Sequence, residues 1–295
     1  MCIIIAKYFD DLGWVGIKNR DRNYVPDISF KRKRANGQEI LYFWDDVTQY
    51  CEGINSNGVA VLSASLMVRD DEKEIEKRST TPSKDGIKIR RALTKTSARD
   101  VAKSLIKQKL TGHTLIFDQD DCYILEGAWR KGEYKSGGYD FHVIDRVPKD
   151  QFVVRTNHGI KLKWAGYQRD NDPSHTMSRI SSECRRLIAE YATEMSDTPL
   201  EIMNRLTEDY TGNGQLNALR TTDELKKMRT TSQTMIIPKE KTMYIRPVQS
   251  NISFDFWQMN NGKSSLWVEM LSNRVLYDGQ RDQDTSMFQQ LRHNL

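Results

Sequence analysis

The chain has 295 residues, of which 38% are hydrophobic and 29% are charged, with a formal net charge of +5. This balance is typical of a globular protein with a sizeable core. The basic residues are scattered among acidic ones, so the charge does not indicate a nucleic-acid-binding surface.

The sequence also lacks the features of several other classes of protein. No apolar stretch approaches the eighteen or so residues that a membrane span needs, and the N-terminus does not read as a signal peptide. Its four cysteines form no CxxC pair and show no zinc-ligand spacing with the five histidines. We therefore expect a reduced cytoplasmic protein with free thiols and no bound metal.

The N-terminal part of the chain is predicted to form antiparallel strands. The β-branched run CIIIAKYF, the DDLG turn and WVGIK predict a hairpin over residues 2–21. A basic, turn-rich stretch follows. EILYFWDD then predicts a strand, and VTQYCEGI and VAVLSASLMV predict a second hairpin around the NSNG turn. Residues 69–87 are charged and predict an exposed loop.

The middle of the chain mixes helices and strands. A helix is predicted at about 97–110 with Ser97 as its N-cap, and strands are predicted within 113–127 and 139–159. Helices are then predicted within 174–195 and 200–210. The first of these has one apolar face, formed by Ile180, Leu187, Ile188 and Tyr191.

Strands return within 231–248 and 264–271. We find no internal repeat and no linker. Hairpins rather than βαβ units predict a single α+β domain over residues 1–295, built on antiparallel sheet.

Cys2 is the first residue whose position suggests chemistry. Removal of Met1 would leave one residue with both a thiol and a free α-amine. Such an amine titrates near 7.7–8.0 and can act as the base that a thiol nucleophile needs. The alternative interpretation is that Cys2 simply begins a buried strand.

Asp21 is the natural candidate for a partner of Cys2. The two residues are nearly equidistant from the DDLG turn, so pairing of the two strands brings them close together. A carboxylate there would hold and orient the N-terminal amine. The alternative is that NRDRN is a solvated turn.

Several motifs in this order resemble the linear amide C–N hydrolases, the cysteine branch of the N-terminal nucleophile hydrolases. This group includes choloylglycine (bile salt) hydrolases, penicillin V acylases and acyltransferase and acid-ceramidase-like amidases. The motifs are the initial MC, the element NRD at 19–21, EGINSNGVAV, TNHG and the late segment TTSQTMIIPKEKTMYIRPV. The resemblance implies a four-layer αββα sandwich and acyl transfer from a small-molecule N-acyl amide, without metal or organic cofactor.

The resemblance also implies roles for individual residues. Cys2 matches the nucleophile, and Asp21 matches the aspartate that binds its amine. Asn157 matches the asparagine that donates to the oxyanion, and Ser65 falls where a backbone N–H supplies the second donor. An arginine of the SSECRRL segment matches a late arginine near the nucleophile, which would favour the thiolate. We favour Arg185, with Arg179 and Arg186 as rivals.

The chain departs from the family pattern beside the aspartate. Bile salt hydrolases and penicillin acylases have an arginine three residues before it, where this chain has Lys18, and Arg20 adjoins Asp21 instead. Both basic residues are candidates for substrate contacts, and TNHG is closer to the acyltransferase and ceramidase-like members. The NRD element also resembles the NRDE proteins, which leaves a non-catalytic binding or trafficking module as an alternative. An unrelated protein with a chance N-terminal cysteine is the third hypothesis.

Other polar and aromatic residues are interpreted more simply. His158 follows Asn157, and strand alternation would point it to the opposite face, so we expect a structural role. The remaining cysteines are expected to pack in the core. Aromatic residues could line an acyl pocket or fill the core; these are Trp14, Tyr42, Phe43 and Trp44. The acyl and amine specificity stay open, as does the oligomeric state, although relatives often form dimers or tetramers.

Overall fold

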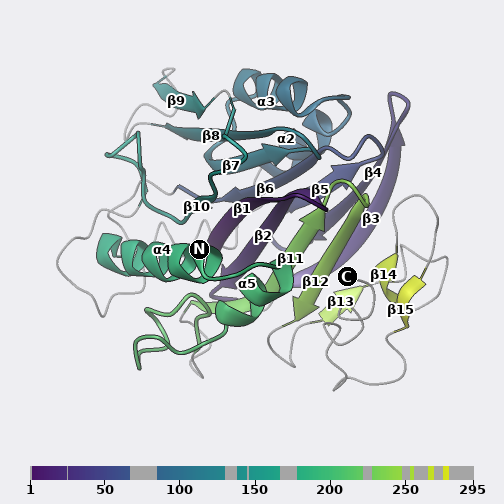
Figure 1. Cartoon of the computed structure of the whole chain (residues 1–295). Helices are drawn as coiled ribbons and strands as arrows, with labels where there is room; N and C mark the ends of the chain where they lie inside the picture. Colours follow the sequence, from purple (N-terminus) through teal and green to yellow (C-terminus); the bar gives the residue numbers. More distant parts are fainter. Residues whose placement is uncertain are drawn as a thin grey trace.

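The computed structural model describes residues 2–24, 26–66, 85–129, 138–144, 146–166, 178–221 and 228–247, together with three short strands at 253–255, 265–268 and 275–278. Two β-sheets lie face to face, and helices cover the outer face of each sheet (Figure 1). The predicted α+β class and the four-layer αββα arrangement are therefore confirmed. No helix among the described residues is long and apolar enough to cross a membrane.

The first sheet has five strands, all paired antiparallel, and carries the N-terminus. In spatial order the strands are β10 (Val153–Arg155), β1 (Cys2–Phe9), β2 (Gly13–Arg22), β11 (Arg229–Ile237) and β12 (Thr242–Pro247). β1 is thus an inner strand whose backbone is paired on both sides.

The second sheet has eight strands and is antiparallel except where β13 pairs parallel with β3. Its spatial order is β13 (Ser253–Asp255), β3 (Asp27–Ala35), β4 (Gln38–Asp45), β5 (Tyr50–Asn55), β6 (Ala60–Ala64), β7 (Gly112–Phe117), β8 (Cys122–Trp129) and β9 (Tyr139–Ile144). A separate hairpin joins β14 (Ser265–Val268) to β15 (Val275–Asp278).

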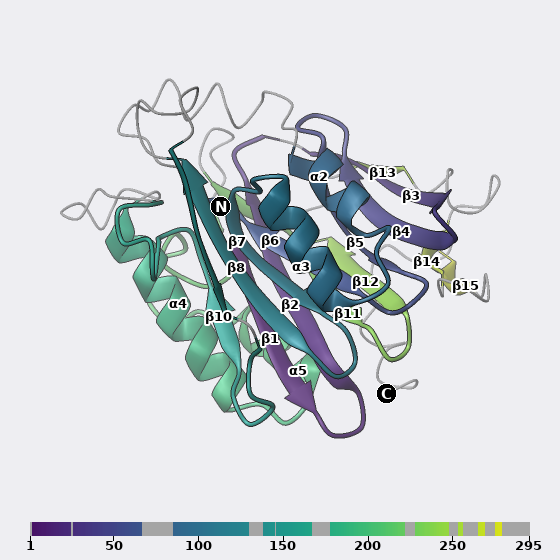
Figure 2. The ribbon, with the colours of Figure 1, turned by 90° about the horizontal axis from the view of Figure 1, so that it is seen from above.

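The helices form the two outer layers. Helices α2 (Asp85–Ala92) and α3 (Ala98–Lys107) pack on the second sheet, as Figure 2 shows from above. Helices α4 (Arg179–Glu194) and α5 (Pro199–Arg205) pack on the first sheet. Ser97 accepts a hydrogen bond from the backbone N–H of Asp100, so the predicted N-cap of α3 is confirmed.

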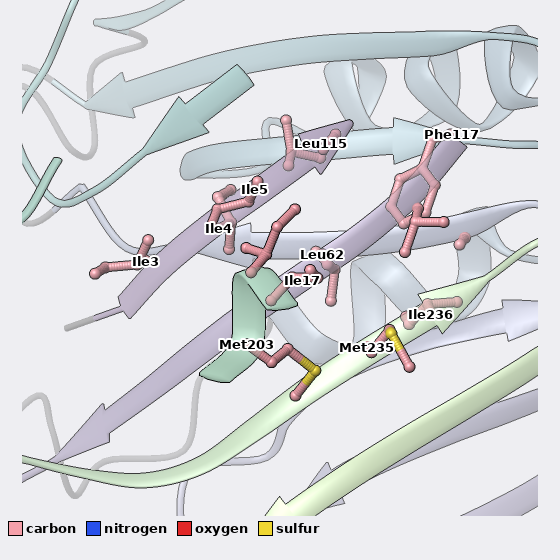
Figure 3. Packing of buried hydrophobic residues seen from close by; sticks show 14 of the residues in the cluster. Ile3, Ile4, Ile5, Ile17, Leu62, Leu115, Phe117, Met203, Met235 and Ile236 are labelled. Carbon is pink, nitrogen blue, oxygen red and sulfur yellow. The ribbon is translucent and has the colours of Figure 1, made fainter. Parts of the chain in front are cut away.

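The main core lies around β1 and β2, between the second sheet and helices α4 and α5 (Figure 3). The sheets are in close contact at Gly16, where a β-carbon would lie 2.8 Å from a side-chain carbon of Leu62 and would overlap the Phe117 ring. Gly16 pairs with Ala6, so that face of the hairpin is small at this point. The pairing fixes which face of β1 and β2 meets the second sheet.

Two elements differ from the sequence expectation. The basic stretch around KRKR is a strand, β3, that pairs with β4 residue by residue, and the turn between them has Asn36 and Gly37 at positive φ. The predicted loop over 69–87 contains the start of α2 at Asp85; residues 67–84 lie outside the described residues. Pairing with the apolar strand β4 overrides the low strand propensity of the charged segment.

The apolar face predicted for α4 points outward. Ile180, Leu187 and Tyr191 are 43%, 53% and 49% exposed, and only Ile188 is packed against the core. The side of the helix that faces the sheet carries Ser181, Ser182, Arg185, Ala189 and Ala192. These mostly small residues let α4 sit close to β1 and β10, and they admit one long polar side chain, Arg185.

Candidate active site

Cys2 begins β1 in the middle of the first sheet and is only 3% exposed. Its backbone nitrogen donates a hydrogen bond to Oδ1 of Asn157, at 2.8 Å. Asn157 lies just after β10, the strand that pairs with β1 on the other side from β2. The fold therefore joins the first residues of the chain to a side chain 155 positions later.

The β1–β2 register decides which side chains share a face with the Cys2 thiol. Cys2 pairs with Arg20 and Ile4 pairs with Lys18. Because paired residues point to the same face and neighbours alternate, the basic side chains of Lys18, Arg20 and Arg22 lie on the thiol side, between the sheets. Asp21 points to the opposite face, toward α4.

The thiol lies in a positively charged environment. Nη1 of Arg22 donates to Sγ of Cys2 at 3.7 Å. Burial raises the pKa of the thiol, but the positive charges of Lys18, the N-terminal amine, Arg22 and Arg20 outweigh this effect and lower the pKa to about 7. Cys2 is therefore partly ionised at neutral pH.

A buried carboxylate from the second sheet balances two of these cations. Glu52 of β5 forms ion pairs with both Lys18 and Arg20, and all three side chains are fully buried. Nζ of Lys18 also donates to the backbone oxygen of Ser63, at 2.7 Å. The guanidinium of Arg20 lies 4.0 Å from the ring centroid of Phe43. Burial lowers the pKa of Lys18, and the charges of Cys2 and Glu52 oppose that shift.

Arg22 is held by a separate set of contacts near the edge of the charged cluster. Its Nη1 donates to the backbone oxygen of Asp21 at 2.8 Å, and its Nε lies 3.5 Å from Oδ2 of Asp45. The hydroxyl of Tyr24 donates to the same Asp45 oxygen at 2.5 Å. Burial, opposed by the charge of Arg22, raises the pKa of Tyr24 to about 12, so its hydroxyl stays protonated at neutral pH.

Asn157 connects Cys2 to the segment after β6. Its Nδ2 donates to the backbone oxygen of Ser65 at 2.7 Å, while its Oδ1 accepts from Cys2. Because one partner is a donor and the other an acceptor, these contacts fix the orientation of the carboxamide. The backbone N–H of Asn157 donates to Oγ of Ser182 on α4 at 3.0 Å, which anchors the residue from behind.

Asp21 lies on the other face, buried against α4 and β11. Its Oδ2 pairs with Nη1 of Arg185 at 2.7 Å, and its Oδ1 accepts from the Thr230 hydroxyl at 2.8 Å. Burial raises the pKa of Asp21, but the charges of Arg185 and Arg220 outweigh this effect. The pKa of Asp21 is therefore below its usual value, and the carboxylate is ionised. The role expected for Asp21, binding of the Cys2 amine, stays a prediction.

The three arginines considered for the late basic position are placed differently. Arg185 is fully buried, pairs with Asp21 and donates to the backbone oxygens of Asn217 and Ala218. Arg179 donates to the backbone oxygen of Lys163. Arg186 pairs with two glutamates on the surface of α4. Arg185 is therefore the one that joins the site, but on the face away from the sulfur.

The chain was also compared with known proteins. No protein-family model matches the sequence, and no curated protein matches it. Among solved structures, penicillin V acylase from Agrobacterium tumefaciens is similar over 84% of this chain and 83% of its own, with 15% identity and a TM-score of 0.46. Two variants of conjugated bile acid hydrolase from Clostridium perfringens are 12% identical over 85% of this chain and 90% of theirs, with TM-scores of 0.43 and 0.40. These are the kinds of enzyme that the sequence resembles.

His158 links the end of β10 to α4. Its Nδ1 lies 2.9 Å from Oγ of Ser182, and its Nε2 lies 2.6 Å from Glu183. Burial lowers the pKa of the ring to about 4 in spite of Glu183, so His158 is neutral at neutral pH. Its contacts fit the structural role that the sequence predicts.

The other cysteines differ from Cys2. Cys51 and Cys122 are buried, and burial raises the pKa of each thiol far above its usual value. Cys184 on α4 is half-buried, and burial raises its pKa as well. Among the four thiols, only that of Cys2 has a lowered pKa.

The aromatic residues divide between two layers. Tyr42 and Trp44 pack with α2 and α3 on the outer side of the second sheet, so they are not beside Cys2. Phe43, between them in β4, faces the inner core and stacks with Arg20. Trp14 is fully buried in the same inner core, at the far end of the β1–β2 hairpin.

Four residues of the charged cluster were missed in the sequence: Arg22, Tyr24, Asp45 and Glu52. Strand alternation in KNRDR predicts that its three bases share a face, which is the signal that identifies Arg22. The partners of these bases come from β4 and β5, and the sequence does not show which residues of the second sheet lie opposite β2. Within the described residues, no group of three or more His, Cys, Asp or Glu side chains is arranged to hold a metal ion.

Proposed function

We propose that this chain is an amidase that hydrolyses linear C–N bonds of small-molecule N-acyl amides. The nucleophile is Cys2, exposed as the N-terminal residue after removal of Met1, and residues 1–295 act as one catalytic domain. The observation that carries the proposal is the placement of Cys2. Its thiol has a pKa of about 7 among cations, and its nitrogen is hydrogen-bonded to the Asn157 carboxamide at 2.8 Å.

In the first step the thiolate attacks the amide carbonyl carbon. A carbon–sulfur bond forms, and the carbonyl electron pair moves onto oxygen. Asn157 supplies a donor for that oxyanion through Nδ2, which now donates to Ser65, and the backbone N–H of Ser65 is the expected second donor. The protonated α-amine of Cys2 gives its proton to the leaving nitrogen as the carbon–nitrogen bond breaks, which leaves a thioester.

In the second step water resolves the thioester. The α-amine, now neutral, takes a proton from the attacking water, the carbon–sulfur bond breaks, and the carboxylic acid leaves. The thiolate and the ammonium are restored, so the net reaction consumes one amide and one water. An amine in place of water would make the same site an acyltransferase.

The environment of the sulfur separates this proposal from that of an inert buried cysteine. An inert cysteine in apolar surroundings has a raised pKa, as Cys51 and Cys122 have. Cys2 is just as buried but faces Lys18, Arg20 and Arg22. A catalytically silent module does not require a thiol that ionises near neutral pH.

Intact-mass measurement tests the proposal. We expect the purified protein to lack Met1, to form a one-to-one adduct with an amide-like electrophile, and to release amine from at least one substrate in a panel of N-acyl amides. Cys2→Ala should abolish both adduct and release, whereas the matched control Cys184→Ala should keep them. A protein that retains Met1, or that releases amine equally well with Cys2→Ala, would refute the mechanism.

A further inference from the structure

Arg22 is the basic side chain that contacts the sulfur of Cys2. Its Nη1 lies 3.7 Å from Sγ, and the same nitrogen donates to the backbone oxygen of Asp21 at 2.8 Å. Lys18 and Arg20 are instead directed to Glu52, and Lys18 also to Ser63. Of these three cations, it is Arg22 that donates to the thiol.

The basic side chains around the thiol outnumber the carboxylates that are paired with them. Lys18, Arg20 and Arg22 provide three positive charges, and Glu52 and Asp45 provide two negative ones. A thiolate supplies the third negative charge. Buried charges are stable only when they are paired, so the cluster favours the ionised form of Cys2.

We propose that Arg22 is a catalytic residue that holds Cys2 as a thiolate before substrate arrives, by donating from Nη1 to Sγ. This inference rests on the proposed function in that Cys2 is taken as the nucleophile. Arg22 lies in the N-terminal hairpin, on the sulfur side of the sheet. It therefore takes the thiolate-stabilising role that the sequence led us to expect of Arg185, whose guanidinium binds Asp21 on the other face.

A thiolate held in this way changes the starting point of the reaction. The α-amine of the processed chain does not have to remove the thiol proton first, so it can begin as an ammonium. An ammonium is the acid that the leaving nitrogen requires. With Arg22 in place, the sulfur would start as the nucleophilic thiolate and the α-amine as the ammonium that acts as the acid.

Arg22 is suited to this role by how it is held. The Asp21 carbonyl and the Asp45 carboxylate fix its fork, and Tyr24 fixes Asp45 in turn. Its side chain is 12% exposed, whereas those of Lys18 and Arg20 are fully buried. The donors of a planar guanidinium are held in a fixed fork, whereas those of an ammonium rotate freely and have no fixed direction.

The pH behaviour of Cys2 depends on the other ionisable groups packed around it. By contacts and register, the groups on this face are Lys18, Arg20 and Arg22 from β2, Tyr24 just after it, Asp45 from β4, Tyr50 and Glu52 from β5, Arg155 from β10 and Arg229 from β11. Burial raises the pKa of both tyrosines, so they stay neutral around pH 7. The groups here that titrate near neutral pH are therefore the Cys2 thiol and the α-amine of the processed chain.

The test is the pH dependence of Cys2 alkylation by iodoacetamide, read by intact mass in the processed protein. Only the thiolate reacts, so the midpoint of the rate profile reports the pKa of the thiol. We expect Arg22→Gln to raise this midpoint by about one pH unit or more, which lowers alkylation at pH 6 about tenfold if intrinsic reactivity is unchanged. A thiolate of higher pKa is also intrinsically more nucleophilic. The midpoint of the pH profile, and not the alkylation rate at one pH, is therefore the measure of the change in pKa.

Two further variants complete the experiment. Arg22→Lys keeps the charge but loses the fork, and its midpoint should lie between those of the parent and Arg22→Gln; it also serves if Arg22→Gln does not fold. Arg32→Gln is the matched control, because Arg32 forms an ion pair with Glu39 on β3 and β4, and it should keep the parent midpoint. A folded Arg22 variant with the parent midpoint would overturn the inference.

The alkylation profile needs no amide substrate, so the two proposals fail separately. A raised midpoint together with no amide hydrolysis would refute the proposed function and keep the role of Arg22 in ionising the thiol. Hydrolysis that depends on Cys2, together with an unchanged midpoint, would support the proposed function and refute the role of Arg22.

Discussion

The Asn157 carboxamide accepts a hydrogen bond from the Cys2 backbone nitrogen at Oδ1 (2.8 Å) and donates one from Nδ2 to the Ser65 carbonyl (2.7 Å). Under the proposed mechanism, this one side chain would position the nitrogen of the nucleophile and supply a donor to the oxyanion. Both functions depend on the loop after β10, which the Asn157 N–H ties to Ser182.

Asn157→Ala should reduce kcat/KM for amide hydrolysis by about 10²–10³, the loss typical of one oxyanion donor. Alkylation of Cys2 by iodoacetamide develops no oxyanion, so it should change far less. The matched control is Asn57→Ala, in the NSNG turn, where Nδ2 donates to Thr96 at the surface. Equal kcat/KM for Asn157→Ala and Asn57→Ala would show that Asn157 has no part in the chemistry.

Arg185 and Arg186 are neighbours on α4 that should respond differently to substitution. Arg185→Met removes the buried ion pair between Arg185 and Asp21, so we expect the free energy of unfolding to fall by about 3–5 kcal/mol. Arg186→Met removes a surface pair with Glu183 and should cost about 0–1 kcal/mol. Urea unfolding measures both; equal losses would contradict the assignment of Arg185 to the buried site.

The effect of Arg185→Met should depend on pH. The pKa of Asp21 is lowered in the folded protein, so the stability it contributes is complete above the unfolded value, near 4. That contribution is lost as the pH falls through the lowered folded value. The difference between Arg185→Met and the parent should therefore shrink below about pH 4, as unfolding at several pH values would show.

Glu52→Gln tests the carboxylate of the second sheet that pairs with two bases of the first sheet. It leaves Lys18 and Arg20 buried without a negative partner, which should cost about 3–5 kcal/mol and lower Tm on the order of 10 °C. Glu39→Gln is the matched control, because its partner Arg32 is 28% exposed, and its Tm should change little. A Tm for Glu52→Gln as high as that of Glu39→Gln would mean that the two bases find other partners.

The sequence predicts much of the first sheet and little of what lies opposite it. The β1–β2 hairpin follows from its β-branched run and turn. The expectation that Asp21 lies opposite Cys2 is wrong by one residue, because Cys2 pairs with Arg20 and the Asp21 side chain points to the other face. Alternation in the same hairpin puts Lys18, Arg20 and Arg22 on one face. Which carboxylates meet them depends on how the second sheet packs on the first, and local sequence does not encode that.

Helix α4 shows why a periodic pattern can mislead. Ile180, Leu187 and Tyr191 have the spacing of a core-facing stripe, yet they are exposed. The face toward the sheet is built from serines and alanines and from Arg185, whose charge is satisfied by Asp21, a residue more than 160 positions earlier. A buried ion pair of this kind becomes visible only when the fold is known.

The last prediction concerns His113, a fully buried residue of β7 whose Nε2 donates to the backbone oxygen of His158 at 2.8 Å. Burial lowers the pKa of His113 to about 3. In the unfolded chain the ring takes up a proton near pH 6.5, whereas in the folded protein it stays neutral to much lower pH. Between these values the unfolded state binds more protons, so stability falls as the pH is lowered.

His113→Gln keeps an N–H donor but removes the titrating ring. Over pH 6 to 4.5 the parent should lose up to about 1.4 kcal/mol per pH unit more than the variant, since one additional proton binds on unfolding. Urea unfolding at half-unit pH steps measures the two slopes, and above pH 7 the difference in stability should no longer change. Parallel slopes throughout this range would mean that His113 is protonated in the folded protein, contrary to its burial.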